Sequence, residues 1–437
     1  MTSTNTLLHL NDRDGHYPES YYAASANPCS DYPALEGDIK CDVVVVGGGF
    51  TGLSSALHLA EHGYDVVLLE AHKVGWGASG RNGGQIGTGQ RRDQDDLEEM
   101  LSKDTARQAW NIAEEAKSVL TGLIDKHNIA CDYKPGCLHA NHKKRYDIHS
   151  KRFVELLNEH YDYDKIRYIE PQELREMVGT EDYSAGTLDM GAGHIHPLNF
   201  ALGIATAASS ASVRIFENSE VLETKHGEPV NVRTAKGNVK ARFLVYACNG
   251  YLGGLSKKVG RHVMPINNYV IATGPLSDER ARSLIRDDVC VADSRFVVNY
   301  YRLSADKRML FGGGESYGYR FPKDIKSFVR RHMLKIYPQL DDVRIDYGWG
   351  GTLAITMSRL PYFQRLSGNV LSASGYSGSG VALATCAGSI IADAIHGNAS
   401  RFDVMSSLPT PGFPGGSAFR SPLLMLGLTW YALRDRL

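Results

Sequence analysis

The strongest hydrophobic pattern lies near the start of the chain. Residues 42–46 form a run rich in valine, typical of a strand buried on both faces of a parallel sheet. The apolar residues Leu53, Ala56, Leu57 and Ala60 then recur at the spacing of a helix. Gly63 is well placed to end this helix. Residues 64–69 form a second apolar run. The pattern predicts a strand, a helix and a second strand in direct succession.

The rest of the chain alternates between helical and strand patterns. Residues 90–190 are rich in charged residues at helical spacing. In residues 262–350, apolar and polar residues alternate as they do in strands. Residues 237–248 predict a hairpin arm leading into a buried strand that stops at Asn249-Gly250. Residues 369–395 predict a short strand, a glycine-serine turn and a helix. Without an internal repeat or low-complexity linker, the pattern favours interlocked parts over a string of modules.

Composition narrows the class of protein. The chain has 437 residues, of which 43% are hydrophobic and 22% are charged, as in a large globular protein. Its 48 basic and 49 acidic side chains nearly balance, and no block of basic residues suggests nucleic acid as a partner. The seven cysteines lack metal-binding spacing, which favours a reducing, cytoplasmic setting without a structural metal.

The two ends carry no clear targeting signal. The first residues lack the pattern of a signal peptide, and no stretch reaches the roughly 18 apolar residues of a spanning helix. The apolar residues 423–433 predict a helix that packs against the protein or a partner. Weak contact with a membrane surface is the alternative for this tail.

The first strand and helix enclose a glycine pattern with known chemistry. Gly47, Gly49 and Gly52 have G-x-G-x-x-G spacing, and Glu70 ends the second strand, 18 residues after Gly52. Such glycines allow a tight turn, close approach of a pyrophosphate and helix packing, and the acid accepts hydrogen bonds from ribose hydroxyls. The pattern predicts a dinucleotide site, with NAD and FAD both open.

Two further segments favour FAD. Residues 74–89 follow the glutamate without a crossover helix, and their small residues, with Ser79, Arg81, Asn82 and Gln85, suit an extended cofactor. A flexible surface loop is the alternative. The helix expected after the turn at 375–380 would direct its N–H groups at something electron-rich, such as the O2 edge of a reduced flavin.

These segments resemble the D-amino-acid oxidase (DAO) family of FAD-dependent oxidoreductases, and within it the gamma-glutamylputrescine oxidoreductases. The resemblance rests on the glycine signature, on "GWGASGRNGGQ", on the 375–380 turn and on "FPGGSAFRSPLLMLGLTWYALRDRL". It implies an α/β fold in which a Rossmann-like FAD-binding domain is interleaved with an α+β substrate domain built on a mixed or antiparallel sheet. The implied divisions are an N-terminal extension (1–40), a discontinuous FAD-binding domain (41–90, 191–261 and 362–400), a substrate domain (91–190 and 262–361) and an apolar tail (401–437).

The motifs and the resemblance together imply a set of cofactor-binding residues. These are Gly47, Gly49, Phe50, Thr51, Gly52, Glu70, Ala71, Gly77, Ala78, Ser79, Gly80, Arg81, Asn82, Gly83, Gly84, Gln85, Val221, Gly250, Gly375, Ser377, Gly378, Ser379, Gly380 and Val381. Two departures from relatives matter. No lysine follows the 375–380 turn, which favours an amine over a simple amino acid. No cysteine lies in 349–361, which favours FAD held without a covalent bond.

Contacts with substrate are expected from an aromatic strand and a tryptophan. The candidates are Tyr300, Tyr301, Arg302 and Trp349, which could surround an amine by cation–π contact; ordinary sheet packing is the alternative. His194 and His196 precede a proline, and without a third ligand at metal-binding spacing they predict a turn that positions the next helix.

The expected reaction is oxidation of a primary or secondary amine, such as gamma-glutamylputrescine or a similar modified polyamine. Hydride passes to flavin N5, water hydrolyses the imine to aldehyde and ammonia, and O2 reoxidises the flavin to give H2O2. Because the flavin supplies the difficult chemistry, no Ser/His/Asp set or carboxylate pair is needed. The alternatives are a FAD-dependent amine or amino-acid dehydrogenase using a quinone or other acceptor, an NAD(P)-dependent dehydrogenase and a non-enzymatic flavin protein. The resemblance also implies slow reaction with oxygen unless Arg308 or another cation takes over, because strand 308–312 lacks the lysine of related oxidases.

Overall fold

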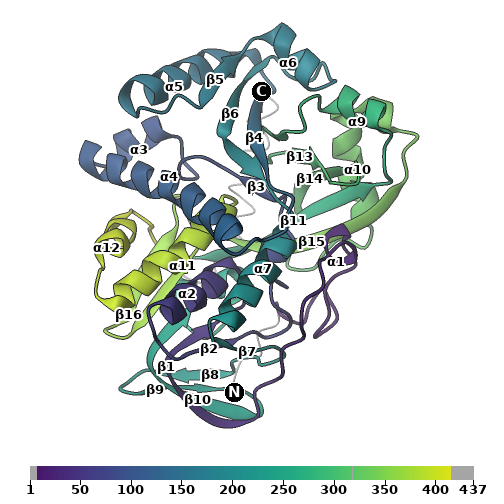
Figure 1. Cartoon of the computed structure of the whole chain (residues 1–437). Helices are drawn as coiled ribbons and strands as arrows, with labels where there is room; N and C mark the ends of the chain where they lie inside the picture. The colour runs from purple at the N-terminus through teal and green to yellow at the C-terminus, as the bar shows by residue number, and fades with distance from the viewer. Residues whose placement is uncertain (1–6, 317, 415–437) are drawn as a thin grey trace.

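A computed structural model describes residues 7–316 and 318–414, and it contains two large sheets (Figure 1). The first sheet, at the bottom of the view, and the second, in its upper right part, are joined by chain segments that pass between them. Helices cover both sheets. The expected α/β class with an interleaved α+β part is confirmed.

The first sheet is mainly parallel. Its described strands are β1 (Gly37–Val46), β2 (Val66–Leu69), β7 (Arg214–Phe216), β8 (Glu223–Lys225), β9 (Val230–Arg233), β10 (Gly237–Tyr246), β16 (Tyr362–Ser367) and β17 (Val370–Ser374). Their order is β16-β17-β10-β1-β2-β7; in addition, β9 pairs with β10, and β8 pairs with β9. The first part of β10 pairs antiparallel with β9 and its end pairs parallel with β17, which matches the predicted hairpin arm and buried strand.

The second sheet is mixed. Its described strands are β3 (Gln85–Ile86), β4 (Lys134–Asn141), β5 (Ile166–Ile169), β6 (Ala185–His194), β11 (Met264–Thr273), β12 (Cys290–Asp293), β13 (Tyr300–Leu303), β14 (Met309–Ser316) and β15 (Ile345–Ile355). Their order is β15-β11-β14-β13-β12-β4-β6-β3, and β5 pairs with β6. The chain therefore visits the sheets alternately. β3 belongs to the second sheet, although its residues fall within the segment 41–90 that was expected to be part of the FAD-binding domain.

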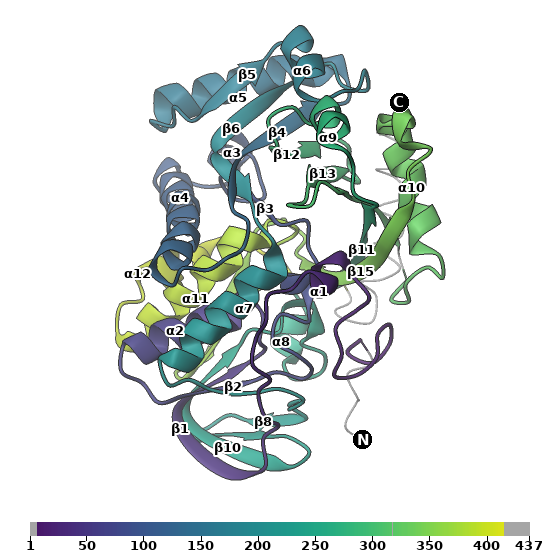
Figure 2. The same ribbon diagram turned by 45° about the vertical axis from the view of Figure 1, so that its right-hand side comes forward.

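The helices form layers around the sheets (Figures 1 and 2). They are α1 (Tyr21–Ala24), α2 (Phe50–Glu61), α3 (Gln94–Met100), α4 (Lys103–Lys126), α5 (Asp147–His160), α6 (Pro171–Met177), α7 (Pro197–Ser210), α8 (Lys257–Gly260), α9 (Asp278–Leu284), α10 (Ile325–Ile336), α11 (Gly380–His396) and α12 (Ser400–Ser407). Helices α2, α4, α7 and α11 share one core with the first sheet. Helices α6, α9 and α10 pack on one face of the second sheet.

The valine run of β1 is buried on both sides, as predicted. Val43 and Val45 belong to the helical core, whereas Val44 and Val46 pack with the valines of β9 on the other face. A continuous apolar run is needed because both faces of this strand are covered. α2 ends at Glu61, and Gly63 follows with φ +85°, which agrees with its expected place just beyond the helix.

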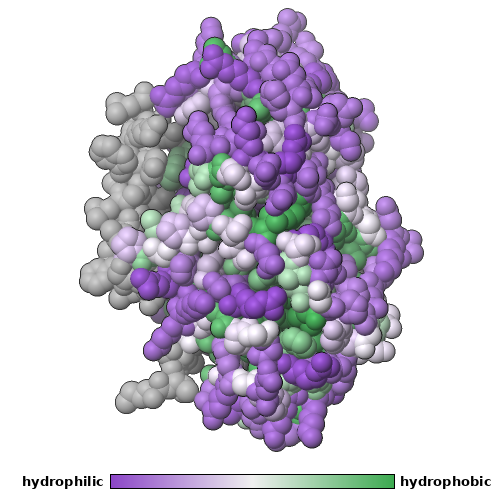
Figure 3. Space-filling view, turned by 90° about the vertical axis from the view of Figure 1, so that its left-hand side faces the viewer, coloured by the Kyte–Doolittle hydropathy of each residue, from purple (hydrophilic) through white to green (hydrophobic). Residues whose placement is uncertain are grey.

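The described surface gives no sign of a membrane span. In residues 7–316 and 318–414 no helix combines the length and the apolar character needed to cross a bilayer. The face in Figure 3 is largely hydrophilic, with hydrophobic residues in scattered areas across its middle. The apolar stretch 423–433 lies outside the described residues, whereas α12, at the start of the predicted tail, packs against α11 and β16.

Candidate functional site

A cavity of about 1610 Å³ lies between the two sheets. Its walls come from the ends of β1, β2 and β10, from the segment after β2, from the start of α11 and from one face of the second sheet. This volume exceeds the roughly 300–1,000 Å³ of ordinary small-molecule pockets. The cavity is therefore large enough to hold an extended cofactor together with a substrate.

The turn between β1 and α2 forms one wall. Gly47 has φ +111°, a conformation that L side chains rarely adopt, and it lines the cavity together with Gly49, Phe50 and Thr51. Gly52 lies behind the turn, where an added Cβ would come 1.8 Å from the Gly47 carbonyl oxygen. The three glycines therefore let α2 start close against the strand, with its N-terminus toward the cavity.

Glu70 lies at the end of β2, beside this turn. Its Oε2 accepts a hydrogen bond from the Gly48 N–H at 2.7 Å, and its Oε1 accepts one from the His72 N–H at 2.9 Å. Burial raises the pKa of Glu70, and these backbone hydrogen bonds oppose the rise. Because a carboxylate has about four acceptor positions, it can still accept hydroxyl groups from a ribose. Ala71 and Val221 line the cavity nearby.

The segment from Val74 to Gly89 runs along the cavity without a crossover helix, as expected. It contains only a short 3-10 helix (Ala78–Gly80) and β3. Seven of its predicted residues line the cavity: Gly77, Ala78, Ser79, Arg81, Asn82, Gly83 and Gln85. Gly80 and Gly84 do not. Ser79 Oγ accepts from the Phe50 N–H at 2.9 Å, which fixes the segment against the start of α2.

Arg81 is a buried cation at this wall, with 2% of its surface exposed. Its Nε donates to the Trp76 carbonyl at 2.6 Å, and its Nη1 lies 2.6 Å from Asp12 Oδ2. Its Nη2 has no hydrogen-bond partner in the described part of the chain. Because buried polar groups are normally paired, this orphan donor at the cavity wall fits a bound group with acceptor atoms, as FAD has.

A second turn approaches from β17. Gly375 has φ +73° and Gly378 has φ +100°. Ser377, Gly378, Ser379, Gly380 and Val381 line the cavity, at the start of α11, whose N-cap Ser379 makes no side-chain cap. Gly375 and Gly250 do not line it. The Tyr376 hydroxyl lies 2.6 Å from Thr51 Oγ1, which joins the two helix starts.

The second sheet supplies the opposite wall, and Tyr300 lies on it. Its ring lies close over Gly312, where an added Cβ would come 2.1 Å from a ring carbon, and its hydroxyl donates to Asn268 Oδ1. Asn268 and Val270 of β11 line the same face. Tyr300 is the one predicted substrate residue among the four that lines the cavity.

The other three predicted substrate residues do not line the cavity, which corrects that expectation. Tyr301 alternates to the opposite face and stacks on Phe311 in the core under α10. Arg302 donates from Nε to the Gly83 carbonyl at 2.8 Å, and Trp349 Nε1 donates to the Arg81 carbonyl at 3.0 Å. These two side chains support the 81–84 segment from behind.

Several cavity residues of the second sheet and its helices were not predicted. Cys137, His139 and Asn141 alternate along β4, and all three line the cavity. Asp93 and His149 also line it, and Asp93 Oδ2 lies 3.3 Å from His149 Nε2. The alternation of 137, 139 and 141 is visible in the sequence, but only the pairing of β4 with distant β12 shows that this face meets the cavity.

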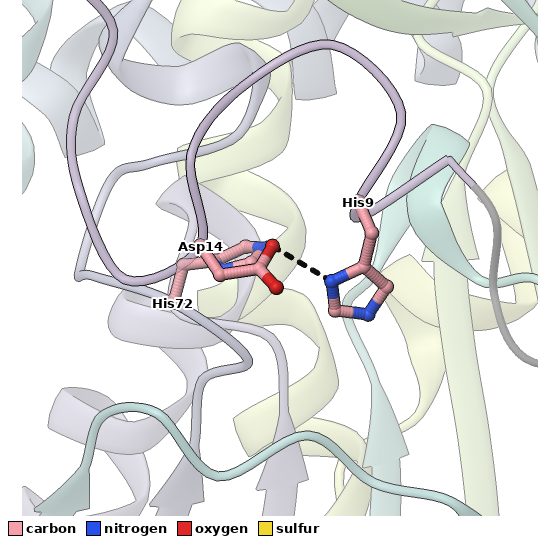
Figure 4. Close-up of side chains that lie close together, drawn as sticks. All are labelled: His9, Asp14 and His72. Atoms are coloured by element: carbon pink, nitrogen blue, oxygen red, sulfur yellow. Dashed lines mark hydrogen bonds and ion pairs between the residues drawn. The ribbon is translucent and has the colours of Figure 1, made fainter.

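The N-terminal segment closes one side of the cavity, where Leu8 contributes to the lining. His9 Nδ1 lies 2.8 Å from Asp14 Oδ1 (Figure 4), and His9 Nε2 lies 3.1 Å from Glu220 Oε2. Across from this pair, His72 Nδ1 accepts from the Gly15 N–H and its Nε2 donates to the Leu8 carbonyl. Both ring nitrogens of His72 are thus engaged by backbone, which fits a role in holding this segment.

His196 is the N-cap of α7, as the predicted turn requires. Its Nδ1 accepts from the Asn199 N–H at 3.1 Å, and His194 Nε2 donates to the Asp288 carbonyl at 2.8 Å. Burial and the charge of Arg302 lower the pKa of both rings to about 3. Both imidazoles are therefore neutral at physiological pH.

Comparisons with known proteins agree with this geometry. Gamma-glutamylputrescine oxidoreductase of Escherichia coli is 43% identical over 96% of this chain and 99% of its own. Probable oxidoreductase OrdL of Rhizobium meliloti is 40% identical over 95% of this chain and 97% of its own. The crystal structure of glycine oxidase from Geobacillus kaustophilus superposes with a TM-score of 0.70 at 19% identity, covering 82% of this chain and 95% of that one.

The family model described as FAD dependent oxidoreductase matches residues 42–394, which includes every expected cofactor-binding residue. The two relatives match along nearly their full lengths, so the resemblance is not limited to the cofactor-binding half. The cavity has the glycine turn, the acidic strand end and the orphan donor that suit FAD. The chain belongs to the DAO family of FAD-dependent oxidoreductases, which act on amine or amino-acid donors.

Proposed function

We propose that this enzyme oxidises the free primary amine of a mono-γ-glutamylated diamine. The amine, O2 and water give an aldehyde, ammonia and H2O2. The observation that carries the proposal is the 43% identity, over 96% of the chain, with the gamma-glutamylputrescine oxidoreductase of Escherichia coli. The C–N bond is oxidised and O2 is reduced by the same two electrons. We also place the reaction in the cytoplasm, in keeping with seven free cysteines.

Bound FAD supplies the two-electron acceptor for this oxidation. The Gly47–Gly52 turn and the start of α2 would hold its pyrophosphate, and Glu70 its ribose hydroxyls. Cys248 also lines the cavity, and burial raises its pKa to about 12, so it stays a protonated thiol and a poor nucleophile. This supports a cofactor held without a covalent bond.

The walls around the substrate would keep its amine in the reactive, unprotonated form. Ile266, Val270, Leu353 and Val381 give this part of the cavity an apolar lining. Burial against such a wall lowers the pKa of an ammonium group, and a fixed pose removes part of the entropic barrier. No lysine lines the cavity in the described residues, which favours an amine over an amino acid at the reacting end.

A dehydrogenase that passes electrons to a quinone is the second candidate. Leu310 and Phe311 are buried in the two cores and neither lines the cavity, so β14 brings no cation to it at these positions. Arg308 is held by Asp306 and Asp346, each at 2.6 Å. These contacts support slow reaction with oxygen. Contact of residues 423–433 with a membrane surface remains a prediction for this candidate.

Product analysis tests the proposed reaction. Purified holoenzyme is incubated with γ-glutamylputrescine in air, and aldehyde, ammonia and peroxide are each quantified. We expect one aldehyde and one ammonia per substrate consumed, with peroxide in proportion to oxygen use. Absence of the aldehyde, or faster use of unmodified putrescine, would contradict the proposed substrate.

A further inference from the structure

The cavity extends well beyond Tyr300, into a part that we call the distal lobe. Its lining comes from the N-cap of α3, from α4, β4, α5 and β5, namely Asp93, Trp110, His139, Asn141, His149 and Ile166. The strands β4 and β5 belong to the second sheet, α5 packs beside them, and Trp110 of α4 packs against α5 and β5. The cofactor-binding turns contribute nothing to this lobe, so it is free to recognise a part of the substrate remote from the reacting amine.

A cross-strand row connects Tyr300 to His139. Tyr300 pairs with Ala292, Ala292 pairs with His139, and His139 pairs with Thr187. Directly paired residues lie on one face of a sheet, and all four line the cavity. Adjacent strands are about 4.8 Å apart, so His139 lies roughly 10 Å from Tyr300 along the cavity floor. A ligand that contacts both Tyr300 and His139 must therefore be roughly 10 Å long.

The distal lobe carries charges of both signs. His139 lines the cavity, so its accessible atoms face that internal space although protein surrounds the ring. Burial disfavours the charged ring, but Cys137 and the carboxylates of Asp93 and Asp189 outweigh it and raise the pKa of His139 to about 9. Burial opposes ionisation of Asp93 too, but His149, His139 and Arg91 lower its pKa. The carboxylates of Asp93 and Asp189 thus favour the protonated form of His139, and the neighbouring cations favour the ionised form of Asp93.

We propose that the distal lobe binds the amino-acid head of the substrate, with His139 facing its α-carboxylate and Asp93 its α-ammonium group. This rests on the proposed function, because γ-glutamylputrescine carries a zwitterionic head at the end opposite its free amine. About eight bonds separate the oxidised carbon from the head carbon, which is roughly 10 Å in an extended chain. That length agrees with the separation of Tyr300 and His139.

The proposal explains how a diamine without the glutamyl group would be rejected. Unmodified putrescine would place its second ammonium group, or nothing, near an imidazolium, and its shorter chain would not span the row. Leaving charged groups of a site unpaired discriminates more strongly than removing apolar contact. His139 and Asp93 would therefore act as specificity-determining residues.

The test compares two substrates on two variants and two controls. The substrates are γ-glutamylputrescine and N-butanoylputrescine, which keeps the amine and the amide but lacks the charged head. The variants are His139→Gln and Asp93→Asn. The matched controls are His160→Gln and Asp95→Asn, two exposed or half-buried residues outside the cavity lining.

We expect each variant to lower kcat/KM for γ-glutamylputrescine about 10- to 100-fold, mainly through KM, and to change kcat/KM for N-butanoylputrescine less than about threefold. The controls should match the parent enzyme on both substrates. Equal losses on both substrates, or no loss on γ-glutamylputrescine, would overturn the proposal. FAD content and the unfolding temperature are measured for every variant to identify misfolding.

A binding measurement keeps this test separate from that of the proposed function. Calorimetry with γ-glutamylbutylamine, which has the head but no oxidisable amine, reports on the distal lobe even if no substrate is turned over. Binding that weakens about tenfold or more in His139→Gln and in Asp93→Asn would support the subsite. Absence of binding to the parent holoenzyme, or binding unaffected by both changes, would overturn it.

Discussion

Asp12 and Arg81 form a buried ion pair between the N-terminal segment and the cofactor-side wall. Their closest atoms are 2.6 Å apart, and 14% and 1% of their side chains are exposed. The guanidinium also lies over the Trp76 ring, 4.3 Å from its centre. The pair therefore fixes a cation at the cavity wall by means of residues that lie 69 positions apart in the sequence.

Replacing Asp12 should weaken both the fold and FAD binding. Asp12→Asn leaves the Arg81 charge without its counter-ion in a buried setting, and we expect a loss of about 1–3 kcal/mol in the free energy of unfolding. FAD should also dissociate more readily. Asp14→Asn, in the same segment but with 65% of its side chain exposed, should change stability by less than about 0.5 kcal/mol. Equal behaviour of the two variants would remove Asp12 from this role.

Gly49→Val should abolish FAD binding. An added Cβ at Gly49 would lie 2.8 Å from Ser79 Oγ, and a branched side chain would project toward the place where pyrophosphate must approach the backbone. The purified variant should be colourless. Gly122→Val is the matched control, because Gly122 is exposed in α4 and an added Cβ there meets nothing within 4 Å. Full FAD occupancy in Gly49→Val would refute the assignment of the turn.

Variants of Tyr300 and Tyr301 should differ, because a change at Tyr300 should affect the kinetics and a change at Tyr301 the stability of the fold. Tyr300→Phe removes the hydrogen bond to Asn268 at the cavity wall. We expect kcat/KM to fall several-fold, and by no more than about tenfold. Tyr301→Phe removes a hydroxyl bonded to Tyr183 within the core, so it should lower the unfolding temperature without changing KM. Steady-state kinetics and thermal unfolding of both variants distinguish the two roles. A larger kinetic loss in Tyr301→Phe would reverse them.

The stability of the protein should fall with decreasing pH partly because of His196. Its folded-state pKa is about 3, below the ordinary 6.5, so its stabilising effect is present above pH 6.5 and is lost as pH falls toward 3. Each pH unit in this window costs up to about 1.4 kcal/mol per histidine. His196→Asn keeps an N-cap acceptor without a titrating ring. The free energy of unfolding, measured with denaturant between pH 5 and pH 7, should depend less steeply on pH in this variant. The same pH dependence in the variant and the parent would contradict the prediction.

Reoxidation should be slow in air. Leu310 and Phe311 do not line the cavity, and Arg308 is held by two carboxylates, so these residues place no free cation beside the reacting amine. We expect measurable peroxide with substrate but faster turnover with a quinone or a phenazine dye. Stopped-flow mixing of reduced enzyme with air-saturated buffer gives the rate. Reoxidation faster than steady-state turnover would identify a true oxidase.

The first strand, helix and second strand could be predicted because their signals are local. The valine run, the 3.6-residue spacing of α2 and the glycine spacing all lie within 30 residues, and β1, α2 and β2 follow them closely. Glu70 was predicted for the same reason. Its position at the end of β2 depends on the strand alone.

The opposite wall could be predicted only in part, because it depends on pairing between distant strands. Alternation separates Tyr300 from Tyr301, but it does not tell which face meets the cavity. Arg302 shares the Tyr300 face and is still covered by the 83–84 segment. His139 gains its position from the pairing of β4 with β12, and Asp12 from an ion pair across the fold. Neither has a local signal.

Anaerobic bleaching of the flavin tests the central claim most directly. The purified yellow enzyme is titrated without oxygen with γ-glutamylputrescine, putrescine, glycine, sarcosine and D-alanine, and the loss of flavin absorbance is followed. We predict that γ-glutamylputrescine bleaches the flavin at the lowest concentration, well below that needed for any of the amino acids. Preferential bleaching by glycine, sarcosine or D-alanine, or no bleaching by γ-glutamylputrescine, would contradict the account.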